Sequence, residues 1–431
     1  MTKYLILGLG TAGFAAALAI KKQDRNASIT FIDKKNFDLL HSCGMPYAIE
    51  GRVSFDSLRH DISSGKMGIK IIQAAATKID VKNKKIEHEK GTEDYDKLII
   101  ALGSYAFMPS IEGVKGRNVF HVNNIENAKW ISENAKNVKS AVVIGAGAIG
   151  LETAFALKQR GLNVKIIEML DSCLPKAIDK DVSEILEEYL KSNGIEIIFG
   201  KKLEKIEEGK VTVSSEEIET EIVIMAAGVK PRIKIAGDAG ILTDKFGIVI
   251  NEKMETNVKD VYAAGDCCQT KNFITGKKYP GLTATISYKQ GTIAGVNASG
   301  GSLEYKGAIT SFVSSIGDLG VAATGLNSYF AKESGFDLVI GKAKGKNKPE
   351  WFPDSDSLMV KVLADKKTSK IIGGQAVGAG AAGNIDVIAT AIKAGMTLQK
   401  ISEIELAYCP AISETYPLLQ QAVDLAIRKI K

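Results

Sequence analysis

The sequence predicts an α/β protein, and three observations lead to this class. The composition is that of an ordinary globular protein, because 45% of the residues are apolar and 25% are charged. Glycine is over-represented, since 42 of the 431 residues are glycine, against an average of about 7%. A unit of strand, glycine-rich turn, helix and strand also occurs twice, and each copy ends in an acidic residue. We therefore expect a framework of parallel strands joined by helices.

Length and charge limit the classes of function. A chain of 431 residues is long enough for about three domains. The net charge of 56 − 50 = +6 is mild, so we expect no nucleic-acid partner. We expect the densest run of basic residues to lie in a solvated turn. The alternative is that these residues attract an anionic substrate. This run contains Lys342, Lys344, Lys346 and Lys348.

The first repeated unit starts almost at the N-terminus. Residues 4–7 (YLIL) are predicted to form a buried strand, and the glycine turn Gly8–Gly13 (GLGTAG) follows. A helix through about Lys22 and a second strand at 28–32 complete the unit, which ends in Asp33. The uncharged stretch that opens this unit falls short of a membrane span. Its regularly spaced glycines favour the strand–turn–helix reading over a signal peptide or a membrane anchor.

The second unit repeats this order downstream. A strand at 141–144 (AVVI) leads into the glycine turn Gly145–Gly150 (GAGAIG), and a helix extends to Arg160. The next strand, 164–167, ends in Glu168. In such units the first glycine makes a tight turn, the second admits a pyrophosphate and the third lets helix and strand pack closely. The helix N-terminus attracts the phosphates, and the acid accepts from the ribose hydroxyls. Two Rossmann-like domains that bind two dinucleotides are therefore predicted.

The residues after Glu168 indicate whether the second site binds NADH or NADPH. Met169 and Leu170 are apolar, and no arginine follows directly to bind a 2′-phosphate. This favours NADH over NADPH. Lys176 is near enough in sequence to keep NADPH as the alternative.

Three further apolar segments are predicted to be strands of the same sheets. They are 95–103 (YDKLIIALG), 222–228 (IVIMAAG) and 260–266 (DVYAAGD). The last one ends in Asp266, at the carboxyl end of a strand, where α/β sheets bind ligands. The sequence leaves two roles open for Asp266. Its carboxylate accepts a hydrogen bond from a cofactor hydroxyl, or the residue only forms part of a turn.

Together these residues resemble the FAD-dependent pyridine nucleotide-disulfide oxidoreductase family over nearly the whole chain. The first turn with Asp33 resembles the family's FAD motif, and the second turn with Glu168 resembles its NAD(P)H motif. LIIALGS, VYAAGDC and LTATISYKQGTIAGVN resemble three further family segments. The resemblance implies that FAD is bound by Gly8, Gly10, Thr11, Ala12, Gly13, Asp33, Lys34, Ser42, Gly103, Asp266 and Ala284. It likewise implies that NADH, with NADPH possible, is bound by Gly145, Gly147, Ile149, Gly150, Glu168 and Gly228.

One segment decides the subgroup. Many family members carry a CxxxxC disulfide after the first unit, whereas this chain has the single Cys43 in the context SCGMPY. That context resembles the single-cysteine branch of coenzyme A-disulfide reductases, NADH oxidases, NADH peroxidases and persulfide reductases. Oxidase and peroxidase members commonly have a histidine where this chain has Thr11, so the resemblance favours disulfide reduction.

The C-terminal segment YCPAISE departs from the family pattern. It resembles the HPxxSE motif, in which a His–Glu pair from the partner subunit acts as acid and base, but Cys409 occupies the histidine position. It also resembles the AYxP stretch of the single-cysteine branch. We expect the catalytic set to be Cys43, Tyr408, Cys409 and Glu414, with Tyr416 as a further proton donor or a packing residue.

Without the resemblance, the residues around Cys43 leave two possibilities open, a buried, inert cysteine, which they favour, and a reactive thiol, which the resemblance favours. The Gly-Met-Pro that follows it predicts a turn or a helix start, and a thiol at a helix N-terminus has a lowered pKa. A thiolate is the competent nucleophile in disulfide exchange. Three other cysteines are predicted to be inert, with Cys267 and Cys268 packed in the core and Cys173 in a loop. No histidine or cysteine spacing indicates a metal site.

The resemblance also implies the domain organisation. An FAD domain at 1–110 and 233–305 is interrupted by an NAD(P)H domain at 111–232, and an α+β dimerisation domain covers 306–431. The resemblance also implies a homodimer. Five scattered cysteines favour a reducing compartment, so we expect a cytoplasmic location.

Three functions compete. The first choice is reduction of a small disulfide or persulfide, with coenzyme A disulfide first among the substrates. The second is an oxidase or peroxidase that reduces oxygen or peroxide. The third, of another class, is a flavoprotein redox sensor or electron carrier.

Overall fold

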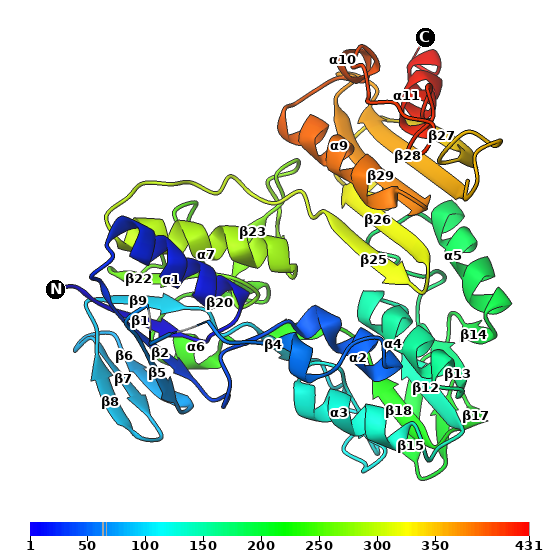
Figure 1. Ribbon diagram of the computed structural model, residues 1–431. Helices are drawn as coiled ribbons and strands as arrows, with labels where there is room; N and C mark the ends of the chain where they lie inside the picture. Colours follow the sequence, from blue (N-terminus) through cyan, green and yellow to red (C-terminus); the bar gives the residue numbers. More distant parts are fainter. Residues whose placement is uncertain (63, 66, 431) are drawn as a thin grey trace. The chain divides into compact units, whose positions relative to one another are not determined.

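The computed structural model describes residues 1–62, 64–65 and 67–430 (Figure 1). Residues 63, 66 and 431, which the predicted domains include, lie outside the described residues. The chain forms two compact units, each assembled from separate stretches. Unit 1 comprises Met1–Gly44, Ser54–Tyr105 and Val229–Ala308, and unit 2 comprises Met45–Val53, Ala106–Gly228 and Ile309–Lys431. Most of the predicted 111–232 and 306–431 domains falls in unit 2, while 229–232 and 306–308 fall in unit 1, and the domain boundaries stay a prediction.

Unit 1 is built on a five-stranded parallel sheet. In spatial order its strands are β22 (Val261–Ala263), β9 (Lys97–Ile100), β1 (Lys3–Leu7), β2 (Ser28–Asp33) and β5 (Ile69–Gln73). Successive residues of a strand point to opposite faces. Tyr4 and Ile6 accordingly pack in one apolar cluster, while Leu5 and Leu7 pack in another. The central strands β1 and β9 are buried on both faces of the sheet, which explains their continuous apolar runs.

Two helices pack tightly against each other in unit 1. They are α1 (Thr11–Gln23) and α7 (Ala284–Ala298), which lie side by side in Figure 1. A Cβ added at Gly291 would lie 2.1 Å from the carbonyl oxygen of Ala12, and one at Gly295 would lie 2.3 Å from that of Ala16. Glycine and alanine therefore allow the two backbones to meet.

Short elements complete unit 1. The hairpin sheet contains β6 (Ala76–Asp80), β7 (Lys85–His88) and β8 (Gly91–Asp94). The strand pairs are β3 (Leu39–Leu40) with β4 (Arg59–His60), β20 (Thr243–Asp244) with β21 (Gly247–Ile248), and β23 (Gln269–Lys271) with β24 (Lys278–Pro280). A further pair is β10 (Ser104–Ala106) with β19 (Val229–Pro231), and the helical turns are α6 (Lys234–Asp238), Ser42–Gly44 and Asp56–Leu58.

Unit 2 contains the second predicted nucleotide-binding sheet, which is also parallel. In spatial order its strands are β11 (Val119–Phe120), β18 (Ile222–Met225), β12 (Ser140–Ile144), β13 (Asn163–Ile167) and β14 (Ile195–Ile198). Its other elements are α2 (Met45–Glu50), α3 (Ile125–Asn134), α4 (Ala148–Gln159), α5 (Lys180–Ser192), β15 (Leu203–Glu207), β16 (Lys210–Val213) and β17 (Glu216–Glu219). Both predicted strand–helix–strand units are present, which confirms the α/β class.

The C-terminal part of unit 2 is an antiparallel sheet with helices, as the α+β prediction requires. Its strands in spatial order are β25 (Phe312–Ile316), β26 (Leu319–Gly325), β29 (Ile371–Gly378), β28 (Ser357–Asp365) and β27 (Leu338–Lys346). The helices are α8 (Ser328–Glu333), α9 (Ala381–Lys393), α10 (Leu398–Ser402) and α11 (Leu418–Arg428).

Two details differ from the sequence prediction. The basic run from Lys342 to Lys346 lies on strand β27 and not in a turn, because its alternate residues Gly341 and Gly345 face α11. All three predicted apolar strands are shorter. β9 ends at Ile100 and the chain turns at Gly103 with a φ of +67°, while β18 ends at Met225 and β22 at Ala263. In the described part of the chain, no helix has both the length and the apolar composition that crossing a bilayer requires.

Candidate nucleotide and thiol sites

The first glycine turn shows a separate steric reason for each of its glycines. Gly8 has a φ of +98°, and a Cβ there would lie 2.4 Å from the carbonyl oxygen of Ala101. A Cβ on Gly13 would lie 2.1 Å from the carbonyl oxygen of Gly8. No atom lies within 4 Å of the Cβ position of Gly10. Gly8 and Gly13 are therefore needed by the fold, whereas Gly10 leaves open space at the start of α1.

Asp33 ties this turn to the end of β2. Its carboxylate accepts from the backbone N–H of Leu9 at 2.7 Å and from that of Lys35 at 2.9 Å. The ammonium of Lys35 lies 2.7 Å from the carboxylate and donates to the carbonyl of Leu9 at 2.8 Å. Burial raises the pKa of Asp33, but the charge and hydrogen bonds of Lys35 outweigh it and hold the pKa below its usual value.

Lys35 is a residue that the sequence argument missed. The resemblance points to Lys34, which is exposed, and its role in cofactor binding stays a prediction. Lys35 follows the end of β2 outside the strand, so the alternation of strand side chains did not identify it.

Asp266 lies beyond the carboxyl end of β22. It accepts from the hydroxyl groups of Ser104 and Ser287, each at 3.0 Å. Burial raises the pKa of Asp266, although these two hydrogen bonds act in the opposite direction. Ser287 comes from the first turn of α7, the helix that begins at Ala284. Neither serine was predicted, because each is far from Asp266 in sequence.

These residues of unit 1 fit a flavin dinucleotide. The first turn of α1 contains no acidic side chain, and its N-cap Gly10 makes no side-chain cap, so its N–H groups are suited to phosphate. Thr11 and Ala12 open the helix. Asp266 has acceptor capacity left for a ligand hydroxyl. Ser42, by contrast, is an exposed residue of the turn that carries Cys43.

The second glycine turn repeats the first in geometry. Gly145 has a φ of +108°, and its added Cβ would lie 2.6 Å from the carbonyl oxygen of Ala226. A Cβ on Gly150 would lie 2.0 Å from the carbonyl oxygen of Gly145, while the Cβ position of Gly147 is open. Ile149 lies in the first turn of α4 and is 44% exposed.

Glu168 holds the second turn as Asp33 holds the first. Its two carboxylate oxygens accept from the backbone N–H groups of Ala146 at 2.8 Å and Leu170 at 2.9 Å. Met169 and Leu170 are exposed beside it, and Lys176 is exposed as well. Gly228 follows β18 with a φ of +102° and open space at its Cβ position. The predicted nucleotide residues of unit 2 thus gather at the carboxyl ends of β12, β13 and β18.

Cys43 lies on a short helical turn of three residues, Ser42–Gly44, and is exposed. The neighbouring backbone is pinned to a second segment, because His41 N–H donates to the carbonyl of Leu58 at 2.9 Å. A Cβ on Gly44 would lie 2.4 Å from the side chain of Leu58. The turn predicted after Cys43 is confirmed, and α2 follows it directly in the chain. The structure thus holds an accessible thiol on a fixed backbone.

The predicted C-terminal group lies in a loop before α11. Tyr408 and Cys409 are exposed, and Glu414 is half-buried. Tyr416 donates its hydroxyl to Asp424, and this hydrogen bond raises the pKa of Tyr416. These residues belong to unit 2, whereas Cys43 belongs to unit 1.

The remaining cysteines are buried, as was predicted for Cys267 and Cys268. Cys267 and Cys268 are fully buried in a core cluster of unit 1. Cys173 lies in the loop after β13, where burial and the charge of Glu187 raise the pKa of its thiol. Within the described residues, no cluster of three or more histidine, cysteine or acidic side chains is arranged to hold a metal ion.

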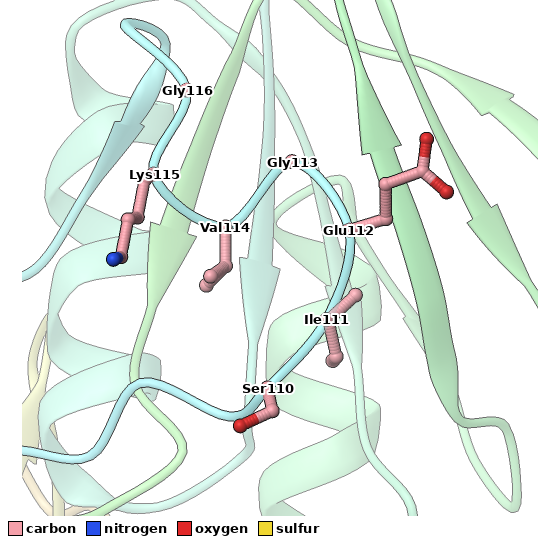
Figure 2. Close-up of a pocket in the computed structure, with 7 residues that line it drawn as sticks. All are labelled: Ser110, Ile111, Glu112, Gly113, Val114, Lys115 and Gly116. Carbon is pink, nitrogen blue, oxygen red and sulfur yellow. The ribbon is translucent and has the colours of Figure 1, made fainter.

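Figure 2 shows a surface hollow that lies apart from these groups. Its volume is about 510 Å³, and it is lined by the consecutive residues Ser110–Gly116. Glu112 and Lys115 extend from the loop in different directions, and Glu112 pairs with Lys205. No predicted site residue lines this hollow, and its polar groups do not converge.

Comparison with known proteins assigns both parts of the chain. The sequence profile of the pyridine nucleotide-disulphide oxidoreductase family matches residues 2–291. The profile of the family's dimerisation domain matches residues 313–419.

Individual relatives cover nearly the full length. The chain is 36% identical to a protein named NADH oxidase from Methanocaldococcus jannaschii, with 99% of each chain aligned. It is 32% identical to a Pyrococcus furiosus protein named NAD(P)H sulfur oxidoreductase (CoA-dependent), with 97% of each aligned. An NAD-dependent persulfide reductase from A. fulgidus has a similar structure, with a TM-score of 0.96 and 32% identity. That match covers 99% of this chain and 83% of the other.

Proposed function

Since this chain belongs to the pyridine nucleotide-disulphide oxidoreductase family and is an NAD(P)H-dependent flavoprotein oxidoreductase, we propose that it reduces a small disulfide or persulfide through Cys43. Coenzyme A disulfide is our first choice of substrate. The observation that carries this proposal is the exposed thiol on a rigid turn in the same unit as the first glycine turn.

The nucleotide-binding part of the proposal follows from the two glycine turns. Gly10, Asp33 and Asp266 would hold FAD in unit 1, and Gly147 and Glu168 would hold NADH in unit 2. When bound, FAD supplies a carrier for two electrons between the pyridine nucleotide and sulfur. The protein's own contribution is a positive helix N-terminus for phosphate and a carboxylate for hydroxyl groups.

The chemistry at Cys43 is thiol–disulfide exchange. The Cys43 thiolate attacks one sulfur of the substrate, so that a bond from its Sγ forms while the substrate's S–S bond breaks. The departing thiolate takes up a proton, and the other half of the substrate remains on Cys43 as a mixed disulfide. Two electrons and a proton then release the second thiol and restore the Cys43 thiolate. The exposed position of Cys43 gives a substrate access to its sulfur.

The proton for the leaving thiolate needs a donor. We propose Tyr408, Cys409 or Glu414, supplied by the partner subunit of a homodimer. Tyr416 is a weaker candidate, because its hydroxyl is already donated to Asp424 and its pKa is raised.

Thr11 supports reduction of disulfides over reduction of oxygen or peroxide. It begins α1 at the position where the resemblance expects a histidine in peroxide-reducing members, and a threonine hydroxyl does not act as an acid or base near neutral pH. The name of the Pyrococcus furiosus relative points in the same direction. The second candidate is an NADH oxidase, which the name of the Methanocaldococcus jannaschii relative favours.

A homodimer is part of the proposal. The dimerisation-domain profile matches residues 313–419, and the loop before α11 exposes Tyr408, Ile412 and Tyr416. Exposed apolar side chains of this kind suit a protein interface. We also propose a cytoplasmic location, because a working thiol needs a reducing compartment.

The deciding experiment is NADH oxidation by the flavin-loaded protein with a panel of acceptors. The panel contains coenzyme A disulfide, polysulfide, cystine, peroxide and oxygen. We expect kcat/KM with coenzyme A disulfide or polysulfide to exceed that with oxygen at least about tenfold, a difference of about 1.4 kcal/mol in barrier. Turnover with oxygen or peroxide alone would establish the oxidase instead. Persistence of reduced flavin with every acceptor would favour a sensor or electron carrier.

A further inference from the structure

The segment between β13 and α5, residues 169–179, contacts the second glycine turn. The backbone N–H of Leu174 donates to the carbonyl of Ala146 at 3.0 Å, and the N–H of Ala146 donates to Glu168 at 2.8 Å. Both backbone polar groups of Ala146, which lies between the first two glycines, are therefore held from outside the turn. Leu174 is buried and has a φ of +49°. Such a strained conformation persists only where the surroundings enforce it.

The far end of this segment is anchored on the C-terminal sheet, within the same unit. The carboxylate of Asp179 accepts from the backbone N–H of Ser328 at 2.8 Å and from its hydroxyl at 2.7 Å. It also lies 2.8 Å from the ammonium of Lys361 on β28. The backbone N–H of Asp179 donates to the side-chain oxygen of Gln375 on β29 at 2.9 Å. Three elements of the C-terminal sheet region thus fix one residue.

Lys361 is the charged centre of this anchor. Its side chain is only 6% exposed, and it lies between Asp179 and Asp181, the latter at 2.6 Å. Removing one member of a buried ion group leaves an uncompensated charge and is strongly destabilising locally. Lys342 also pairs with Asp181, at 2.8 Å, but its side chain is 46% exposed. The two lysines therefore share one partner while differing in burial and in contact with Asp179.

We infer that Lys361 and Asp179 position the second glycine turn for the pyridine nucleotide, acting through Leu174 and Ala146. The inference rests on the proposed function in one respect, namely that this turn binds NADH. The C-terminal sheet is then part of the NADH site as well as of the dimerisation domain. If the anchor is lost, the segment 169–179 relaxes and the carbonyl of Ala146 loses its donor. The glycine turn then no longer holds the geometry in which its N–H groups face the pyrophosphate.

The test is anaerobic bleaching of the flavin-loaded protein by NADH, followed as a function of NADH concentration. The half-saturating concentration reports nucleotide binding, and the limiting rate reports the step that follows it. For Lys361→Met we expect the half-saturating concentration to rise at least about tenfold, while the limiting rate changes less than about twofold. Lys361→Arg keeps the charge and is expected to recover most of the affinity. The matched control Lys342→Met is expected to stay within about twofold of the wild type.

The outcomes separate a positioning role from a merely structural one. Equal half-saturation for Lys361→Met and wild type overturns the inference, as does an equal loss in Lys342→Met. If Lys361→Met does not fold, Ser328→Ala removes one hydroxyl donor from Asp179 and keeps the backbone donor. We expect about threefold weaker NADH for Ser328→Ala, and an unchanged value overturns the inference. Wild-type protein that NADH fails to bleach contradicts the proposed function, and the inference falls with it.

Discussion

The two glycine turns have the same backbone but differ in what holds them. In each, the first and third glycines are required by a carbonyl oxygen less than 3 Å from the Cβ position, and the second faces open space. In each, an acid at the end of the next strand accepts a backbone N–H from the turn. Asp33 additionally binds the Lys35 ammonium, which also reaches the carbonyl of Leu9. At the second turn, the equivalent carbonyl of Ala146 accepts a backbone N–H from Leu174.

The difference shows two ways to fix one motif. A lysine two residues after the acid closes the first turn, so this turn is held by groups within a short stretch of unit 1. The second turn depends on a longer segment that is anchored on a different sheet.

The largest expected effect lies beyond both turns, at Cys43. Cys43→Ser should bind FAD and be bleached by NADH as the wild type is, because both turns are intact. It should lose turnover with coenzyme A disulfide or polysulfide by at least about a thousandfold, since an alcohol does not replace a thiolate in exchange. Stopped-flow bleaching and steady-state turnover on the same preparation measure the two properties separately.

Cys409→Ser is the matched control for this substitution, because Cys409 is the other exposed cysteine. If Cys409 only packs, turnover falls by less than about tenfold, or about 1.4 kcal/mol of barrier. An active Cys43→Ser together with an inactive Cys409→Ser would show that the nucleophile is misassigned. Loss of activity in both variants would indicate a Cys43–Cys409 pair across the dimer.

The next largest effects come from the open glycines. Gly10 and Gly147 both have extended backbone angles that alanine adopts, and neither has an atom within 4 Å of its Cβ position. Gly10→Ala and Gly147→Ala should therefore fold normally. We expect Gly10→Ala to weaken FAD binding at least about tenfold, because the new methyl group meets the pyrophosphate. Gly147→Ala should keep its FAD and raise the KM for NADH by a similar factor.

Titration with FAD and NADH kinetics distinguish the two glycine variants. If the two turns bind different nucleotides, Gly10→Ala weakens only FAD binding and Gly147→Ala weakens only NADH binding. Weaker FAD binding in Gly147→Ala, or normal binding of both nucleotides in both variants, would contradict the assignment of the turns.

A smaller effect is expected for the choice of nucleotide. A carboxylate at Glu168 accepts from a 2′-hydroxyl and repels a 2′-phosphate, so the wild type should prefer NADH. Glu168→Gln keeps an oxygen acceptor for the N–H of Ala146 but removes the charge. We expect the ratio of kcat/KM for NADH to that for NADPH to fall about tenfold, or about 1.4 kcal/mol. A wild-type preference for NADPH would point to Lys176 or to a more distant cation.

The smallest expected effect is a shift in the pH of acid unfolding when Lys35 is replaced. The second turn has no lysine at the equivalent place. The pKa of Asp33 is lowered in the folded protein, so its contribution to stability is present above the unfolded pKa and is lost as pH falls through the folded pKa. In Lys35→Met the effect of burial is no longer outweighed, and the pKa of Asp33 rises. Acid unfolding of the flavin-free protein should then begin at higher pH.

Circular dichroism between about pH 2 and 6, around the unperturbed aspartate pKa of about 3.9, measures this midpoint. The control is Lys22→Met, which removes an exposed lysine of α1 and should leave the midpoint in place. Equal midpoints for Lys35→Met and Lys22→Met would show that the ion pair does not stabilise the first turn.

The strand–helix–strand units could be predicted because their signals are local. Each glycine turn, the flanking apolar runs and the terminal acid lie within about thirty residues, where periodicity and turn chemistry act directly. The same locality explains the correct prediction of a turn at Cys43 and of buried positions for Cys267 and Cys268.

The contacts that complete the sites could not be predicted in this way. Ser104 and Ser287 reach Asp266 from segments 162 and 21 residues away, and Asp179 meets Lys361 across 182 positions. Such pairs follow from tertiary packing, and a single serine or lysine carries no periodic signal. Tyr416 illustrates the same limit, because only its hydrogen bond to Asp424 shows that its proton is already donated.

The contact between α1 and α7 has a consequence for synthesis of the chain. Ala12 meets Gly291 across 279 residues, and a Cβ at Gly291 would collide with the backbone of Ala12. At about 5–20 residues per second, α7 leaves the ribosome roughly 14 to 56 seconds after α1. During that interval the alanine-rich face of α1 lacks the helix that covers it in the folded protein, although the strands and helices of residues 111–232 are synthesised before α7.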